Sequence, residues 1–117
     1  MGRQGAGAAL ADRIRRKGLR VRGGPWTLCG LPGGTGQRIV ALGAKAGGAV
    51  TRSRIRRIAR TTLHPDWARD GKVDILLLAR SEVADLPRQR VRSELTQLLS
   101  RLMAAVVRAR GTQGTDG

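Results

Sequence analysis

The chain of 117 residues contains no phenylalanine and no tyrosine, and it has only one cysteine and one histidine. Cys29 has no second cysteine with which to form an internal disulfide, and its place in the apolar segment 26–31 predicts core packing. A single cysteine and a single histidine leave no ligand set for a structural zinc site. They also leave no cysteine–histidine pair close in sequence for nucleophilic catalysis. His64 precedes Pro65 at a helix end, where we expect it to contact terminal carbonyls.

Long hydrophobic segments are also absent. The longest uninterrupted apolar run, 102–107, is far too short to cross a bilayer, and no secretory signal is recognisable at the N-terminus. We therefore expect a cytoplasmic protein. Segments 1–8 and 111–117 lack apolar periodicity, so we expect them to be disordered tails around a single domain at 9–110.

Acidic residues are few: eight, against 23 lysines and arginines, for a net charge of +15. Between residues 1 and 65 the only acidic residue is Asp12. Such an imbalance indicates a polyanionic partner. RNA or DNA fits better than a membrane, because the basic helix described next lacks the Trp, Phe and Leu face of interfacial helices.

Segment 46–60 joins a glycine pair to a helix-forming stretch that carries Arg52, Arg54, Arg56, Arg57 and Arg60. At ~100° per residue, these arginines share one broad side of a helix, opposite Ile55, Ile58, Ala59 and Thr62. Without acids, that side repels itself unless an anion covers it. The planar arginine fork suits phosphate oxygens, and Gly47 and Gly48 allow a phosphate to approach the positive helix N-terminus. The pattern predicts nucleic-acid contact.

The remaining segments alternate between helical and extended patterns. We expect a short basic helix at 9–17, strands within 19–31 and at 38–42, the arginine helix ending near Leu63, a buried central strand at 73–79 and a final leucine-rich helix. This order, α-β-β-β-α-β-α, predicts an α+β two-layer sandwich, with a β-α-β unit that joins the strands at 38–42 and 73–79. Segment 33–36, Gly-Gly-Thr-Gly, lacks the lysine and the spacing of a phosphate-binding loop and favours a hairpin turn.

Two further groups favour structural roles. Asp66, Asp70 and Asp74 lie close in sequence, but two fall in a loop and one begins a strand, so turn and capping contacts are expected in place of a protein-held magnesium pair. Trp67 is expected to fill the edge of the core. Trp26 faces either the core or the outside, because its strand register is not fixed by sequence.

Several of these motifs, in order, resemble the protein subunit of bacterial ribonuclease P over roughly 13–108. Segment 47–60, Gly-Gly-Ala-Val-Thr-Arg-Ser-Arg-Ile-Arg-Arg-Ile-Ala-Arg, is similar to the basic signature of that family. The strand at 73–80, followed by Ala84-Asp85-Leu86 and a leucine helix, is similar to its last strand and helix. The stretch 18–32 is similar to its first strands.

Departures from the family pattern concern both the signature and the aromatic residues. Asparagines of the signature are replaced by Gly48 and Ser53, an acidic residue by Thr61, and a Ser-Lys-Lys element by Gly43-Ala44-Lys45. The family lines a cleft on its sheet with Phe and Tyr that stack on single-stranded RNA, and this chain has neither. Stacking contributes roughly 1–3 kcal/mol per base, so we expect weaker leader binding or a greater dependence on Arg and Lys.

The resemblance implies a chain without catalytic residues. In the family, the RNA subunit with Mg²⁺ hydrolyses the bond that joins the 5′ leader to precursor tRNA, and the enzyme also processes other small structured RNAs. The protein binds that RNA and the leader, raising substrate affinity and broadening specificity, with one protein per RNA subunit. The implied RNA-subunit contacts are Lys45, Arg52, Ser53, Arg54, Arg56, Arg57 and Arg60. The implied leader contacts are Arg20, Arg22 and Trp26. The resemblance also implies a left-handed β-α-β crossover.

Two alternatives share the charge pattern. A structural RNA-binding protein, such as a ribosomal protein with a similar sandwich, is distinguished by its failure to stimulate cleavage of precursor tRNA. A helix-turn-helix DNA binder requires a second helix packed before the arginine helix, where the sequence predicts strands.

Overall fold

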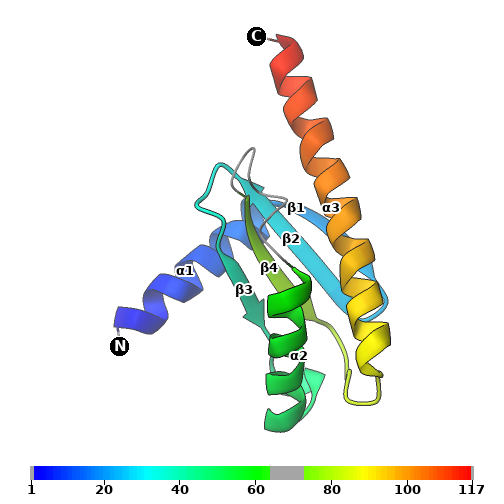
Figure 1. Ribbon diagram of the computed structural model, residues 1–117. Coiled ribbons are helices and arrows are strands. Elements are labelled where there is room, and N and C mark those ends of the chain that lie inside the picture. Colours follow the sequence, from blue (N-terminus) through cyan, green and yellow to red (C-terminus); the bar gives the residue numbers. More distant parts are fainter. Residues whose placement is uncertain (1, 64–72, 117) are drawn as a thin grey trace.

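In the described residues, three α-helices and four strands follow one another in the predicted order (Figure 1). The structure, a computed structural model, describes residues 2–63 and 73–116, and it describes side chains from 8 to 63 and from 73 to 109. The α+β class is confirmed. The elements are α1 (Gly2–Lys17), β1 (Leu19–Gly23), β2 (Trp26–Pro32), β3 (Arg38–Ala41), the 3-10 turn η1 (Ala44–Ala46), α2 (Ala49–Thr62), β4 (Val73–Ala79) and α3 (Arg88–Asp116).

Strand β4 lies inside the sheet, whose strand order is β1-β2-β4-β3. It pairs antiparallel with β2 and parallel with β3, which confirms the predicted central strand and the β-α-β unit. In Figure 1, β3 and β4 both run downward, β4 lies to the right of β3, and α2 lies in front of them. This arrangement is a left-handed crossover, an exception to a strong preference for right-handed ones.

The hairpin of the sheet joins β1 to β2 and does not involve segment 33–36. Gly23 pairs with Trp26, and Gly24, with a φ of 56°, takes the left-handed conformation in the two-residue turn. The predicted hairpin turn at 33–36 is wrong, because β4 is inserted between β2 and β3. A strand that is apolar on both faces is buried most deeply with a neighbour at each edge.

The Asp74 carboxylate holds segment 33–36 against β4. Its Oδ1 atom accepts hydrogen bonds from the backbone N–H groups of Thr35, Gly36 and Gln37, at 3.1, 3.0 and 2.9 Å. The carboxylate also lies against Gly34, where any side chain would collide with it. The predicted turn role is therefore confirmed for Asp74, whereas Asp66 and Asp70 lie outside the described residues.

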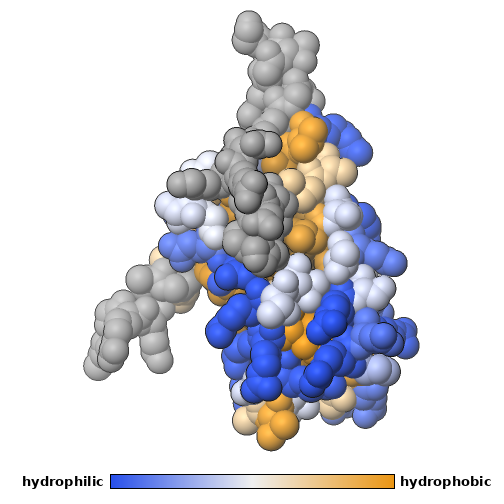
Figure 2. All heavy atoms as spheres, viewed as in Figure 1, coloured by the Kyte–Doolittle hydropathy of each residue, from blue (hydrophilic) through white to orange (hydrophobic). Residues whose placement is uncertain are grey.

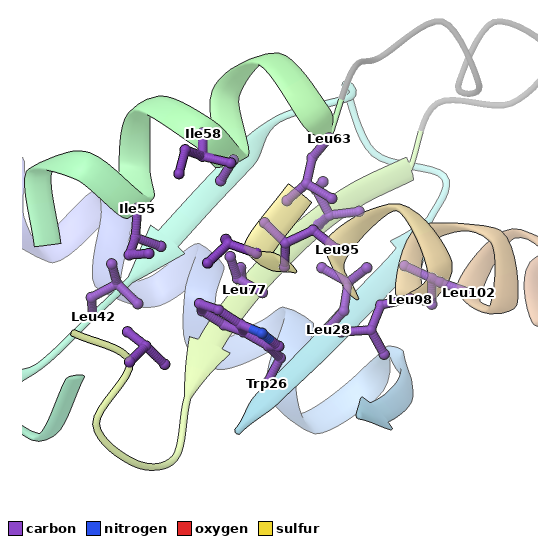
Figure 3. Close-up of a cluster of buried hydrophobic side chains, with 14 of the residues drawn as sticks. Trp26, Leu28, Leu42, Ile55, Ile58, Leu63, Leu77, Leu95, Leu98 and Leu102 are labelled. Carbon is purple, nitrogen blue, oxygen red and sulfur yellow. The ribbon is translucent and has the colours of Figure 1, made fainter. Parts of the chain in front are cut away.

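The main core lies between the sheet and the pair α2 and α3, which cover the same face (Figure 3). Helix α2 contributes Ile55 and Ile58, and the sheet contributes Leu28 and Leu77, all of them buried. The leucine-rich helix follows the predicted 3.6-residue period. Its buried stripe consists of Val91, Leu95, Leu98, Leu102 and Val106. The buried residues of the sheet, α2 and α3 together form the core of the predicted sandwich.

Helix α1 covers part of the opposite face of the sheet. Ile14 packs there against Cys29 and Leu76, all three buried, so the predicted core role of Cys29 is confirmed. Helix α1 ends as predicted at Lys17, and the N–H of Gly18 donates to the carbonyl of Ile14 at 2.8 Å. Helix α1 begins at Gly2 and helix α3 ends at Asp116, so both extend into the segments expected as tails, 1–8 and 111–117. The domain limits at 9 and 110 stay a prediction.

Candidate nucleic-acid interface

Helix α2 starts after a tight bend that requires glycine at position 47. Gly47 has a φ of 141°, and a Cβ atom there would lie 2.9 Å from Cγ2 of Thr51. Gly48 is extended, and its carbonyl accepts the N–H of Arg52 at 3.0 Å. No side chain caps the start of α2 with a hydrogen bond, and the first turn of the helix, which the structure describes in full, contains no acidic residue. Within these residues, nothing offsets the positive end of the helix dipole. This end of α2 is electrostatically suited to an anion.

The exposed side of α2 is strongly cationic, as predicted. Arg56, Arg57 and Arg60 are exposed, whereas Ile55 and Ile58 on the opposite side are buried. Within the described part of the chain, these three arginine side chains make no hydrogen bond or ion pair. Figure 2 shows hydrophilic side chains gathered over α2 and the adjoining start of α3. Ser53 and Lys45, also predicted contacts, are exposed on α2 and η1.

Two of the predicted arginines make contacts within the protein. Arg54 is half-buried, and its Nη2 atom donates to the carbonyls of Ala84 and Leu86, at 3.3 and 3.1 Å. It therefore joins α2 to the segment that leads into α3. Arg52, also half-buried, directs its Nε atom toward the carbonyl of Gly48 at 3.5 Å. The arginines of α2 therefore fall into two groups. Arg52 and Arg54 contact backbone carbonyls, whereas the side chains of the other three have no partner among the described residues.

Sequence reasoning missed Arg38, which lies at the start of β3. Its Nη1 atom donates to the carbonyls of Arg60 and Leu63, at 2.6 and 3.2 Å, and so satisfies the C-terminal end of α2. A hollow of about 160 Å³ lies between β3 and α2, with Arg56 and Arg60 also in its lining. The isolated arginine at a strand end gave no periodic signal that connects it to α2.

Sequence reasoning also missed Arg88 and Arg92, which are exposed in the first two turns of α3. Both line a hollow of about 290 Å³ together with Arg54 and Arg57. A neighbouring hollow of about 400 Å³ is lined by Arg88 and residues of α2. The spacing of four between Arg88 and Arg92 was the available signal, since it places both on one side of a helix.

Arg20 and Arg22 lie on the face of the sheet that α1 partly covers. The register pairs Arg20 with Cys29 and Arg22 with Thr27, so these side chains share the face on which Cys29 packs. Both arginines are exposed, and Nη2 of Arg20 donates to the carbonyl of Arg15 at 3.1 Å. The neighbouring partly buried apolar residues on this face are Leu31, Ile39, Ala41 and Leu78. None of them has a ring for stacking.

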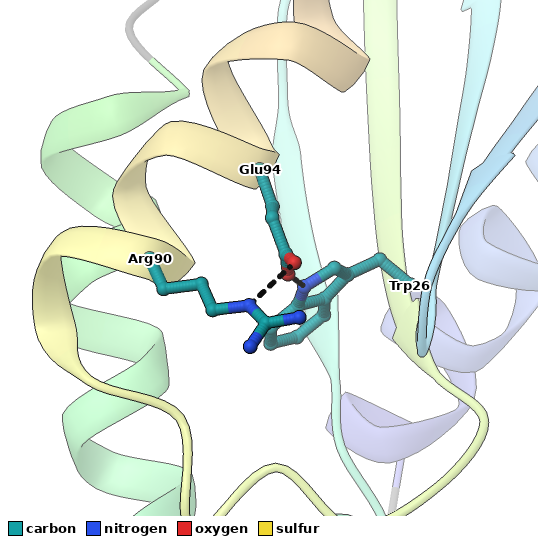
Figure 4. A network of polar contacts seen from close by, with 3 residues as sticks. All are labelled: Trp26, Arg90 and Glu94. Carbon is teal, nitrogen blue, oxygen red and sulfur yellow. Dashed lines mark hydrogen bonds and ion pairs between the residues drawn. The ribbon is translucent and has the colours of Figure 1, made fainter.

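Trp26 points to the opposite face and is fully buried (Figure 4). Its indole Nε1 donates to Oε1 of Glu94 at 2.8 Å, and Oε2 of Glu94 pairs with Nε of Arg90 at 3.1 Å. The predicted leader contact at Trp26 is therefore wrong, because the ring has no exposed surface to offer a base. The register, which sequence left open, decides this point. Trp67 lies outside the described residues.

A family model described as Ribonuclease P matches residues 11–103, well over half of the chain. The chain belongs to the Ribonuclease P family. The match spans the α2 arginine helix, the central strand β4 and most of α3. No match was found among curated protein sequences.

Solved structures with a similar fold include the RNase P protein of Staphylococcus aureus, with a TM-score of 0.67 and 22% identity over 79% of this chain and 87% of that one. A mutant of that protein with defective mRNA degradation activity gives a TM-score of 0.68 and 22% identity over 80% and 81%. The RNase P protein of Thermotoga maritima gives 0.62 and 19% over 75% and 86%. At these identities the likeness shows a shared fold.

As a member of the Ribonuclease P family, this chain is a subunit of ribonuclease P and an RNA-binding protein of tRNA processing. It also implies a partnership with the RNase P RNA. The structure does not fit the helix-turn-helix alternative, since β3 and the three-residue turn η1 directly precede α2. A helix-turn-helix would require an α-helix there.

No set of three or more His, Cys, Asp or Glu side chains in the described residues is placed to bind a metal ion. The Asp74 carboxylate already accepts hydrogen bonds from three backbone N–H groups at its Oδ1 atom. His64 lies outside the described residues. The described helices also include none with the length and apolar character needed to span a bilayer.

Proposed function

We propose that this chain is the accessory protein of a ribonucleoprotein that removes the 5′ leader from precursor tRNA, and from other small structured RNAs. The RNA subunit is the catalyst, and the chain contributes binding. It docks on the RNA subunit through the cationic side of α2, holds the leader elsewhere, and so raises substrate affinity and broadens specificity. One protein binds each RNA subunit, and the complex works in the cytoplasm.

The exposed charge on α2 is the observation that carries this proposal. Arg56, Arg57 and Arg60 extend from a helix whose opposite side is anchored in the core by Ile55 and Ile58. Like charges held side by side repel one another in the free protein. Bound phosphate would relieve this repulsion, because its oxygens are negatively charged and accept hydrogen bonds from the guanidinium N–H groups. Lys45, Arg52, Ser53 and Arg54 flank these contacts.

Arg20 and Arg22 are the proposed leader contacts. They lie on the sheet face whose described apolar residues are aliphatic, so they would bind leader phosphates in place of stacked bases. Contacts of this kind weaken with salt, because each phosphate that is neutralised releases counterions. Leader binding by this chain should therefore depend more on ionic strength than on base identity.

Magnesium, in this proposal, is held by the RNA subunit and the substrate. In the described residues no group of three or more His, Cys, Asp or Glu is placed to hold a metal ion, and the proposal assigns no step to a metal bound by the protein. By neutralising phosphates where RNA subunit and substrate meet, the arginines would reduce the Mg²⁺ concentration that cleavage requires.

The test is cleavage of a 5′-extended precursor tRNA by a bacterial ribonuclease P RNA at low Mg²⁺, with and without the protein. We expect the protein to stimulate cleavage at the mature 5′ end and to show no activity without the RNA. Tight, salt-sensitive RNA binding without stimulation would contradict the proposal and favour the structural RNA-binding alternative.

A further inference from the structure

A groove between α2 and the start of α3 is lined mainly by basic and small polar side chains. Its two adjoining hollows, of about 400 and 290 Å³, share Arg54, Arg57 and Arg88. Arg92 completes the second hollow, and Ser53 and Thr61 add hydroxyl groups. No acidic side chain of the described residues lines either hollow. Four guanidinium groups therefore converge from two helices that are far apart in sequence.

This convergence is held in place by the protein itself. Arg54 donates to the carbonyls of Ala84 and Leu86, which fixes the segment before α3 against α2. Buried Val91 and Ile58 belong to the same core and keep the two helices packed together. Arg57, Arg88 and Arg92 are consequently brought near one another by the fold, although each is exposed and repels the others.

The start of α3 increases the positive potential of the groove. The first turn of this helix, which the structure describes, contains no acidic residue, and it contains Arg88 at the positive end of the helix dipole. Acidic residues are favoured at such a position and basic ones are disfavoured. An anion in the groove would offset both the dipole and the repulsion among the arginines.

The groove also has an apolar end. Val50 is 84% exposed, which is unusual for a large hydrophobic side chain, and together with Ala49 it lines the same hollow as Arg57 and Arg88. Charged and apolar contacts side by side fit a nucleotide, whose phosphate is anionic and whose ribose and base offer apolar surface. A simple inorganic anion would make no use of Val50.

We infer that the α2–α3 groove is a second binding site for the phosphate backbone of an RNA strand, which shares Arg57 with the exposed side of α2 and adds Arg88 and Arg92 of α3. This inference rests on the proposed function, because it takes the RNA subunit as the ligand. It adds α3 to the interface, which the α2 signature alone does not include. Helix α2 then lies between two lines of phosphate contacts, one at the groove and one at Arg56 and Arg60.

The test compares Arg88→Gln/Arg92→Gln with a control on α1, Arg13→Gln/Lys17→Gln, which removes the same charge from two exposed residues, also four positions apart, outside the groove. Binding to the RNA subunit is measured over a range of salt concentrations. The groove variant should bind roughly tenfold more weakly at moderate salt, because charge-assisted hydrogen bonds to phosphate are removed. Its log-log salt slope should become shallower by about 0.7–0.9 for each phosphate that is no longer neutralised. The control should change both quantities much less.

A double-mutant cycle between Arg57→Gln and Arg92→Gln then shows whether both side chains hold the same strand. Residues that share a ligand give non-additive losses, and residues that act separately give additive ones. Circular dichroism melts check that each variant is folded. A groove variant that binds like the control would overturn the inference and leave the proposed function standing. If the wild-type protein neither binds the RNA subunit nor stimulates cleavage, the proposed function itself fails.

Discussion

The exposed side of α2 and the sheet face beside α1 are both candidate RNA surfaces, yet they are built differently. On α2, Arg56, Arg57 and Arg60 project from an anchored helix with no partner among the described residues. On the sheet face, Arg20 and Arg22 border aliphatic residues, and no aromatic ring is present on its described part. The first surface offers dense charge at fixed spacing. The second offers little charge and no stacking, so the two should differ in affinity and in what they recognise.

The largest expected effect comes from removing the charge of α2. Arg56→Gln/Arg57→Gln/Arg60→Gln should weaken binding to the RNA subunit about 100-fold or more, because up to three charge-assisted hydrogen-bonding groups are removed. The salt slope should fall by roughly 0.7–0.9 per phosphate. The fold should be intact, since none of the three side chains enters the core. A titration of the RNA subunit with protein measures both quantities.

The matched control is Arg13→Gln/Arg16→Gln/Lys17→Gln, which removes three exposed charges from α1 on the other side of the sheet. It should reduce affinity for the RNA subunit far less. Equal losses in the two variants would mean that net charge alone determines binding, and the contrast between the two surfaces would disappear.

Trp26→Phe separates a core role from a stacking role. The substitution leaves the Glu94 carboxylate without the indole donor, whose Nε1 atom lies 2.8 Å from Oε1. We expect a loss of about 1–3 kcal/mol in the free energy of unfolding, because a hydrogen bond to a charged group is removed and the smaller ring leaves a cavity in the core. At a temperature where the variant is folded, its affinity for the leader should equal that of the wild type. A leader-specific loss without destabilisation would place the ring at the RNA surface.

Arg54 and Arg57 lie three positions apart on α2, and their substitution should affect different properties: protein stability for Arg54 and RNA binding for Arg57. Arg54→Gln removes the donor to the carbonyls of Ala84 and Leu86, and we expect it to lower unfolding free energy by about 1–2 kcal/mol. Arg57→Gln should leave thermal stability unchanged and weaken RNA binding several-fold. Denaturant titrations and RNA titrations on both variants test this contrast, which fails if Arg57→Gln is the less stable protein.

The smallest expected effect is on the sheet face. Arg20→Gln/Arg22→Gln should lower the affinity for leader-containing precursor tRNA a few-fold, because two contacts in high dielectric contribute modestly. Affinity for tRNA without a leader should be unchanged. The measurement is the ratio of the two affinities, which cancels general effects of charge. An unchanged ratio would remove these residues from the proposed leader contacts.

Periodicity made much of this fold predictable from the sequence. The 3.6-residue pattern separated Ile55 and Ile58 from the arginines of α2, and it identified the buried stripe of α3. The short apolar run at 73–79 indicated a central strand. These features follow from local spacing, because one face of each element must be buried.

Features that depend on distant partners were not predictable. Strand order places β4 between β2 and β3, so the glycine-rich segment 33–36 binds Asp74 and forms no hairpin. The carbonyl partners of Arg54 lie 30 and 32 residues away. The side on which Trp26 lies depends on register. The groove arginines Arg88 and Arg92 became candidates only when α3 was seen beside α2.

The most direct test of the central claim is RNA-dependent cleavage of precursor tRNA at low Mg²⁺ by three proteins: the wild type, Arg56→Gln/Arg57→Gln/Arg60→Gln and the α1 control variant. The account predicts strong stimulation by the wild type and by the control, and a large loss for the α2 variant that excess protein restores. Equal stimulation by all three proteins would contradict the claim that the α2 arginines dock this chain on the catalytic RNA.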